Sequence, residues 1–213
     1  MSSSKNTTTS NAFASSASPL VAESPDFPRP VLLPKPFLFV RHGETFHNRA
    51  RIIAGSQDVV LTPKGKQQAI DAGTLLRDWQ GEIVVSSSQL RARQTAKLAL
   101  PGYRVTPMKG LRERRWGSLE QGPIIHPMPY LNPPADAEPW NDFVVRIAES
   151  LNSVLAQYDN PVVFAHSGVF RAIRYLTLGT HEGPSAVNAR PMQVIPPQGE
   201  YSEWQLVPLG QAE

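Results

Sequence analysis

The sequence predicts an α/β fold, a three-layer sandwich in which a mostly parallel sheet carries helices on both faces. Two observations predict it. Short continuous apolar runs, typical of strands buried on both faces, recur along the chain, and segments with helical periodicity stand between them. A length of 213 residues suits one domain with attachments, and 40% hydrophobic with 18% charged residues suits a chain that folds around a core.

Residues 1–35 are predicted to form a disordered tail, because they are rich in Ser and Thr and poor in large apolar side chains. The folded domain is then expected over 36–213. No basic start precedes an apolar stretch, which argues against a secretory signal, and the shortage of Arg argues against an organelle transit peptide. A cytoplasmic location is therefore the expectation, and no apolar run is long enough to predict a membrane span.

Within the folded region, predicted strands and helices alternate. The run 37–40 is the first buried strand, and Thr62-Pro63 then provides the N-cap and first residue of a helix that ends near 79–81. From Trp140, apolar residues recur at three- and four-residue steps, the clearest helical pattern in the chain. The other expected elements are strands at 83–85, 103–108 and 162–165, helices at 90–98 and 169–178, and a final hairpin of 193–195 with 201–207.

Proline is unusually frequent, with 21 residues in the chain against an average usage of about 5%. One cluster, at 19–36, marks the boundary between the tail and the first strand. The other, at 123–139, lies in a stretch without periodicity, which predicts a short insertion over about 118–139. Because proline stiffens a loop and removes amide donors, we expect a rigid lid whose contributors to a pocket are His126 and Tyr130.

Polar groups follow the ends of the predicted strands, where open α/β sheets bind ligands. Arg41 and His42 come directly after the first strand, Arg91 comes early in the helix after the second, Glu113 lies beyond the third and His166 ends the fourth. Guanidinium groups hold phosphoryl oxygens, a neutral imidazole can attack phosphorus, and a carboxylic acid can protonate the leaving oxygen. The pattern predicts phosphoryl transfer that needs no metal.

The same positions resemble the motifs of the histidine phosphatase superfamily, also called the phosphoglycerate mutase-like family. The run 41–48 matches the signature RHGETxxN, and 55–65 is similar to GxxDxxLTxxG. Residues 91–96 resemble the helix start RAxxTA, and 111–122 resemble the segment LxExxxGxxxG. His166 corresponds to the second histidine of the family. The resemblance covers about 37–207 with the motifs in order.

This resemblance implies that His42 is the phosphorylated nucleophile and Glu113 the proton donor. Arg41, Arg91 and His166 would complete the phosphate pocket. No cofactor and no metal are implied. Further contacts with substrate are expected from Asn48, Ser56, Gln57, Arg114, Arg115 and Ser167.

Several alternatives stay open at this point. Glu120 lies close to Glu113 and could be the acid instead. Two histidines with one carboxylate could in principle hold a metal, although the neighbouring Arg residues disfavour a cation there. His181 is expected in an exposed loop, and His47 at the pocket wall or the surface.

The resemblance covers both phosphatases and mutases. Mutases of the family carry a long insertion that keeps water from the phosphoenzyme, whereas the interval between Glu113 and His166 is short here, which favours a phosphatase. A non-catalytic phosphate-binding scaffold is the remaining alternative. The basic stretch 109–115 suggests a small, anionic phosphorylated substrate, while the scattered charge elsewhere predicts no nucleic acid partner. The oligomeric state is left open.

Overall fold

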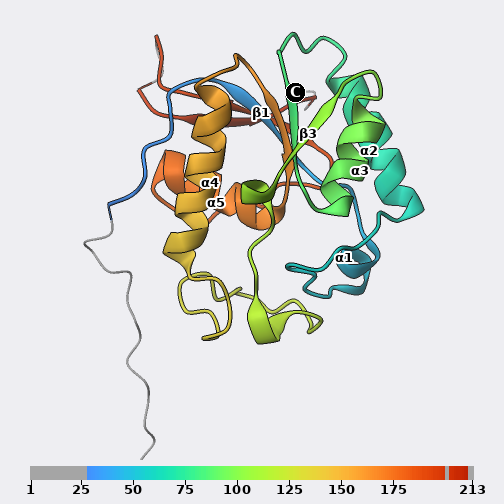
Figure 1. Ribbon diagram of the computed structural model, residues 1–213, viewed down its shortest axis with the longest axis vertical. Helices are drawn as coiled ribbons and strands as arrows, with labels where there is room; N and C mark the ends of the chain where they lie inside the picture. The colour runs from blue at the N-terminus through green and yellow to red at the C-terminus, as the bar shows by residue number, and fades with distance from the viewer. Residues whose placement is uncertain (1–27, 200–201, 211–213) are drawn as a thin grey trace, which may run out of the picture.

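A six-stranded sheet forms the middle layer of the molecule (Figure 1). In the computed structural model, which describes residues 28–199 and 202–210, the strand order is β3-β2-β4-β1-β5-β6. The first four of these run parallel, whereas β5 pairs antiparallel with β1 and β6 antiparallel with β5. The predicted α/β class and mostly parallel sheet are confirmed. The strands are β1 (Phe37–Arg41), β2 (Val84–Ser87), β3 (Val105–Met108), β4 (Val162–Ala165), β5 (Pro191–Ile195) and β6 (Gln205–Pro208).

Helices cover both faces of the sheet. The helices α4 (Trp140–Leu155) and α5 (Ser167–Leu178) pack on one face, and α2 (Pro63–Leu75) and α3 (Leu90–Ala99) pack on the other (Figure 1). The predicted start of α2 is correct, since the Thr62 hydroxyl accepts the N–H of Gly65 and a proline fills the first turn. These helices fix the orientation of the strands whose ends carry the polar groups.

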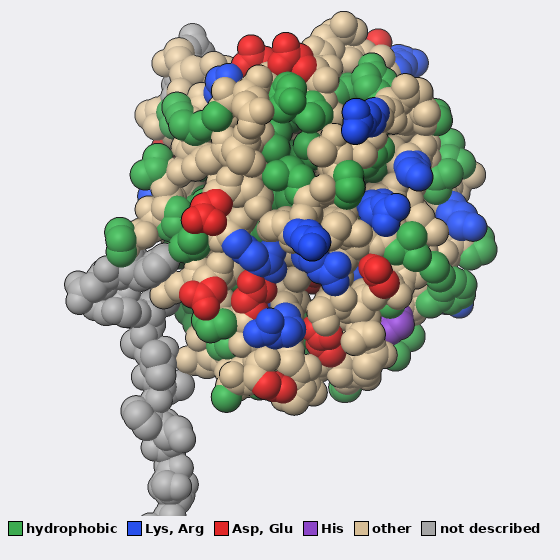
Figure 2. Space-filling model, viewed as in Figure 1, with side chains coloured by type: hydrophobic (Ala, Val, Ile, Leu, Met, Phe, Trp, Pro, Cys, Tyr) green, Lys and Arg blue, Asp and Glu red, His purple; other side chains and the backbone are tan. Residues whose placement is uncertain are grey.

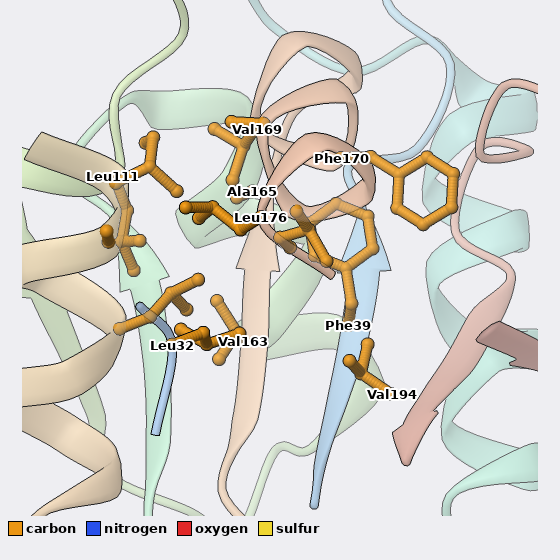
Figure 3. Close-up of a cluster of buried hydrophobic side chains, with 14 of the residues drawn as sticks. Leu32, Phe39, Leu111, Val163, Ala165, Val169, Phe170, Leu176 and Val194 are labelled. Atoms are coloured by element: carbon orange, nitrogen blue, oxygen red, sulfur yellow. The ribbon is translucent and has the colours of Figure 1, made fainter. Parts of the chain in front are cut away.

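Alternating side chains of the central strands supply two separate cores. On β1, Phe37 and Phe39 face α4 and α5, while Leu38 and Val40 face α2 and α3. Figure 3 shows the first of these cores, where Phe39 lies with Phe170 and other side chains between the sheet and α5; the two rings stack at 5.3 Å between centroids. Because both faces are apolar, the polar groups of the central strands can gather only at the strand ends.

Beside the two histidines, the elements differ from those expected in two ways. A short helix, α1 (Phe46–Ala50), follows β1 and was not predicted, since five residues carry no apolar periodicity. Its cap is local: the Thr45 hydroxyl accepts the N–H of Asn48, and the Asn48 side chain accepts the N–H of Thr45. In addition, α5 begins at Ser167 instead of 169, so its first turn directly adjoins His166.

The start of the folded domain lies earlier than expected. The predicted tail includes 28–35, whereas Leu32 in this segment is 4% exposed in the core between the sheet and α4. Asn152 of α4 accepts the N–H of Leu33 and donates to the carbonyl of Val31. These hydrogen bonds attach the segment to the domain. The composition of the segment does not reveal them, because the partner side chain, Asn152, is far away in the sequence. The predicted disorder of 1–27 lies outside the described residues.

The predicted lid, together with α1 and the short 3₁₀ turn η2 (Gly117–Leu119), lies at one end of the molecule, at the bottom of Figure 1. This is the end toward which the carboxyl ends of the parallel strands point. A second 3₁₀ turn, η1 (Lys109–Leu111), connects β3 to this region. Among the residues described, no helix has the length and apolar character needed to cross a membrane.

Candidate functional site

Two histidines from neighbouring parallel strands form the centre of the site. His42 follows β1 and His166 follows β4, and the N–H of His42 donates to the carbonyl of Ala165 at 2.9 Å. The ring centroids are 5.3 Å apart, and both side chains are buried. Pairing of the two strands therefore brings together two imidazoles that are far apart in the sequence.

The backbone fixes which nitrogen of His42 is free to react. Nδ1 lies 2.8 Å from the carbonyl oxygen of Gly43, and since a carbonyl only accepts, Nδ1 carries the proton. Burial lowers the pKa of His42 well below its usual 6.5, and the charges of Arg91 and Arg41 lower it further. His42 is therefore neutral at pH 7, with the lone pair of Nε2 available as a nucleophile.

His166 and two arginines present polar atoms that have no partner in the described part of the chain. Both ring nitrogens of His166 are buried without a hydrogen bond, and so are Nε of Arg41 and Nε of Arg91. Burial and the charge of Arg91 hold the pKa of His166 well below 6.5. Buried polar atoms normally find partners, and Arg41 and Arg91 line a cavity, so these unpaired atoms fit an anionic oxygen ligand such as a phosphoryl group.

Backbone carbonyls hold the two guanidinium groups in place. Arg91 donates to the carbonyls of Gln57 at 2.7 Å and Gly55 at 3.0 Å, and Arg41 donates to the carbonyl of Ala186 at 2.9 Å. Burial lowers the pKa of Arg91 to about 10, which still leaves it charged at pH 7. Since carbonyls are neutral, they orient these groups without cancelling the positive charge that an anion would meet.

Glu113 lies at the cavity wall, next to the first turn of α5. One carboxylate oxygen accepts the N–H of Gly168 at 3.0 Å and the other accepts the N–H of Arg114 at 2.9 Å. A Cβ at position 168 would overlap the carboxylate of Glu113, so glycine is required for this approach. The turn after His166 therefore positions the acid beside the histidine pair.

Glu120, the other candidate acid, has a structural position. Its carboxylate accepts from both the N–H and the hydroxyl of Ser56 and from the N–H of Trp116. It does not line the cavity, whereas Glu113 does. The geometry thus favours Glu113 as the group that reaches a ligand.

The remaining expected contacts divide into two sets. Asn48 and Ser167 line the cavity, whereas Ser56 pairs with Glu120, and Gln57 contributes its carbonyl to Arg91. Arg114 is fully buried and does not line the cavity: it donates to the carbonyls of Tyr130 and Glu138 and lies over the rings of Trp116 and Trp140.

Arg115 also does not line the cavity; it is exposed and contacts Asp136 and Glu138. On the face seen in Figure 2, basic and acidic side chains are interleaved near the centre. Within the basic stretch 109–115, Arg114 therefore holds the lid in place through its hydrogen bond to Tyr130. None of the basic residues of this stretch lines the cavity, so they do not supply it with positive charge.

The cavity has a volume of about 540 Å³. The expected lid residues His126 and Tyr130 do line it. His181 also lines it and is half-buried, with its ring 5.4 Å from that of Tyr130, although an exposed loop was expected. Several lining residues were not predicted from the sequence, and those on α5 and the loop after it are Arg171, Glu182, Gly183 and Ser185.

Arg171 holds the loop 181–185, which lines this part of the cavity. It lies one helical turn beyond Ser167 on α5, a spacing that could have identified it. Its guanidinium donates to the carbonyls of His181 and Gly183 and to the hydroxyl of Ser185. In the described residues, no group of three His, Asp or Glu side chains is arranged to hold a metal ion.

The neutral histidine pair predicts a specific pH dependence of stability. Below pH 6.5 the unfolded chain binds protons at both imidazoles while the folded chain does not, so the folded state loses stability as the pH falls. The expected loss is about 1.4 kcal/mol per imidazole for each pH unit below 6.5. Urea unfolding at pH 7.5 and 5.5 measures it. His166→Gln should lose less stability than the wild type over this interval, and equal losses would contradict the assignment.

Comparison with known proteins adds to this geometry. A family profile described as "Histidine phosphatase superfamily (branch 1)" matches residues 37–192. The broad-specificity phosphatase YOR283W of Saccharomyces cerevisiae is 31% identical over 163 residues, which cover 67% of this chain and 70% of that protein. "Probable phosphoglycerate mutase GpmB" of Erwinia tasmaniensis is 44% identical over 84 residues, which cover 38% of this chain and 39% of that protein.

Among solved structures, the crystal structure of TTHB049 from Thermus thermophilus is similar, with a TM-score of 0.65 and 28% identity. The match covers 82% of this chain and 98% of that chain. The family match therefore spans the four parallel strands, both histidines and the lid, whereas the mutase match spans a smaller part of both chains.

Proposed function

Because the chain belongs to branch 1 of the histidine phosphatase superfamily, we propose that it is a metal-independent phosphomonoesterase that works through a phosphohistidine at His42. The observation that carries the proposal is the buried, neutral histidine pair flanked by Arg41 and Arg91. A small phosphorylated molecule is the substrate class that this pocket fits.

In the first step, Nε2 of His42 attacks phosphorus in line with the ester oxygen. The new P–N bond forms as the P–O bond breaks, and the electron pair passes to the leaving oxygen, which takes a proton from Glu113. Arg41 and Arg91 neutralise the charge on the non-bridging oxygens during transfer. The hydrogen bond from Nδ1 to Gly43 holds the imidazole in the attacking orientation.

In the second step, water attacks phosphorus and the P–N bond breaks, which returns the electron pair to Nε2 of His42. Glu113, now a carboxylate, accepts the proton of the attacking water. Inorganic phosphate leaves and both groups regain their starting states. Positive charge from the arginines supplies the stabilisation that a metal ion provides in other phosphatases, and it would repel a metal cation at the same place.

Hydrolysis is favoured over mutase chemistry by the size of the lid. The interval between Glu113 and His166 contains η2, the lid and α4, and leaves no room for a larger cover that would exclude water from a phosphoenzyme. A relative that carries the name broad-specificity phosphatase matches two thirds of this chain, which supports the same choice.

Two assays test the function. We expect the wild-type protein to hydrolyse p-nitrophenyl phosphate in EDTA, and to release phosphate from 3-phosphoglycerate faster than it forms 2-phosphoglycerate in the presence of a trace of the bisphosphate. Faster interconversion would instead identify a mutase. Absence of turnover with both compounds would favour the non-catalytic phosphate-binding scaffold.

A further inference from the structure

The cavity has a second half that the phosphoryl chemistry does not use. Besides its polar groups, the cavity is lined by apolar side chains from the lid and the segments next to it: Ile52, Ile53, Trp116, Ile124 and Met128. We call these five residues the apolar wall. None of them can contribute to phosphoryl transfer, so the wall faces the group to which the phosphate is esterified.

The apolar wall is held by backbone hydrogen bonds between two segments that are distant in sequence. The N–H of Ile53 donates to the carbonyl of Gly122, and the N–H of Ile124 donates to the carbonyl of Arg51. Ile52 also forms an isolated antiparallel bridge with Pro123. A wall paired in this way is formed before substrate binds, so little ordering cost opposes binding.

Arg114 fixes the far end of the lid against the same wall. It is buried between the rings of Trp116 and Trp140 and donates to the carbonyl of Tyr130 at 2.7 Å. The Tyr130 ring meets that of Trp116 edge-on at 5.3 Å between centroids. The position of the apolar groups is therefore set by packing as well as by backbone pairing.

Charged side chains are few among the lining residues outside the phosphate end. Among the lining residues outside the phosphate end, Arg171 and Glu182 are the pair of opposite charges, and the guanidinium of Arg171 is engaged by the carbonyls and hydroxyl of the 181–185 loop. The basic residues Arg114 and Arg115, which suggested an anionic organic group, do not line the cavity. The five side chains of the apolar wall themselves present no charged group to the esterified part of a substrate.

We propose that the enzyme prefers phosphomonoesters whose esterified group is uncharged and apolar, an alkyl or aryl body that packs on the apolar wall. The proposal rests on the phosphomonoesterase function above and specifies its substrate class. Burial of each methylene against the wall is expected to raise kcat/KM by up to about fourfold until the wall is filled.

The test uses n-alkyl phosphates from ethyl to hexyl, because the leaving-group pKa scarcely changes along this series. We expect kcat/KM to rise with chain length and to exceed the value for 3-phosphoglycerate at hexyl phosphate. A flat or falling series, or a preference for 3-phosphoglycerate over hexyl phosphate, would overturn the proposal. Ile124→Thr should lower the hexyl-to-ethyl ratio about three- to tenfold, whereas Ile124→Val, which has the shape of threonine without the hydroxyl, should nearly keep it.

A binding measurement separates this proposal from the proposed function. Alkylphosphonates, which cannot be hydrolysed, should bind more tightly as the chain lengthens when titrated by calorimetry. Rising affinity without turnover of any ester would support the apolar wall and contradict the hydrolase function. Turnover with affinity independent of chain length would contradict the apolar wall alone.

Discussion

Replacement of His42 by alanine is expected to lower kcat for p-nitrophenyl phosphate by at least about 10³-fold. The reason is that the remaining groups bind and neutralise the phosphoryl group but offer no nucleophile at the position of Nε2. The structure leaves Nε2 as the unprotonated nitrogen, because Nδ1 donates to the carbonyl of Gly43. Steady-state hydrolysis in EDTA measures the loss.

A trapping experiment tests the same residue more directly. Labelled substrate quenched in base should leave one phosphoryl group on the wild type and none on His42→Ala, and the label should be lost on acid treatment, as expected for a phosphoimidazole. His47→Ala is the matched control, since that side chain lies outside the cavity and contacts Gln121. Labelling of His42→Ala equal to that of the wild type would place the nucleophile elsewhere.

Replacement of Glu113 by glutamine is expected to have an effect that depends on the leaving group. Glutamine keeps the shape and can accept the N–H of Gly168, yet it has no acidic proton to give. For ethyl phosphate, whose alkoxide needs protonation, kcat/KM should fall about 10²- to 10⁴-fold. For p-nitrophenyl phosphate, whose phenolate leaves without a proton, the fall should be much smaller.

Glu120→Gln is the matched control for this prediction. Its carboxylate holds Ser56 and the N–H of Trp116, so the substitution should cost about 1–3 kcal/mol of unfolding free energy. It should change kcat/KM for ethyl phosphate and for p-nitrophenyl phosphate by the same factor. If Glu120→Gln lowered kcat/KM much more for ethyl phosphate than for p-nitrophenyl phosphate and Glu113→Gln did not, the roles of the two carboxylates would be exchanged.

The elements of the fold were largely predictable from the sequence because their signals are local. The runs at 37–40 and 162–165 are apolar without interruption, which is typical of strands covered on both faces, and Thr62-Pro63 marks a helix start by its own chemistry. These local signals do not predict a segment whose position depends on contacts with residues that are distant in the sequence. Residues 28–35 have the composition of a tail, yet contacts with remote parts of the chain hold them in place, among them those of Asn152, Asp159 and the core around Leu32.

The phosphate end of the site was predictable for a related reason. Arg41, His42 and His166 stand at the ends of strands, and the rule that parallel strands end at one edge brings them together whatever the loops do. Glu113 could be named but not separated from Glu120, because both lie in one irregular segment. The separation depends on Gly168, where the first turn of α5 approaches the carboxylate of Glu113.

By itself, then, the sequence determined the α/β architecture, the family and the groups proposed to meet a phosphoryl ligand, since each is encoded in runs or motifs of a few residues. Only the tertiary structure decided which side chains of the irregular segments are buried, which are exposed and which line the cavity. Arg114 turns into the protein between two tryptophans while Arg115 remains exposed, and Ile53 and Ile124 meet through pairing of distant segments. Side-chain direction in a loop depends on packing against remote parts of the chain, so local sequence cannot specify the part of the cavity that carries the apolar wall.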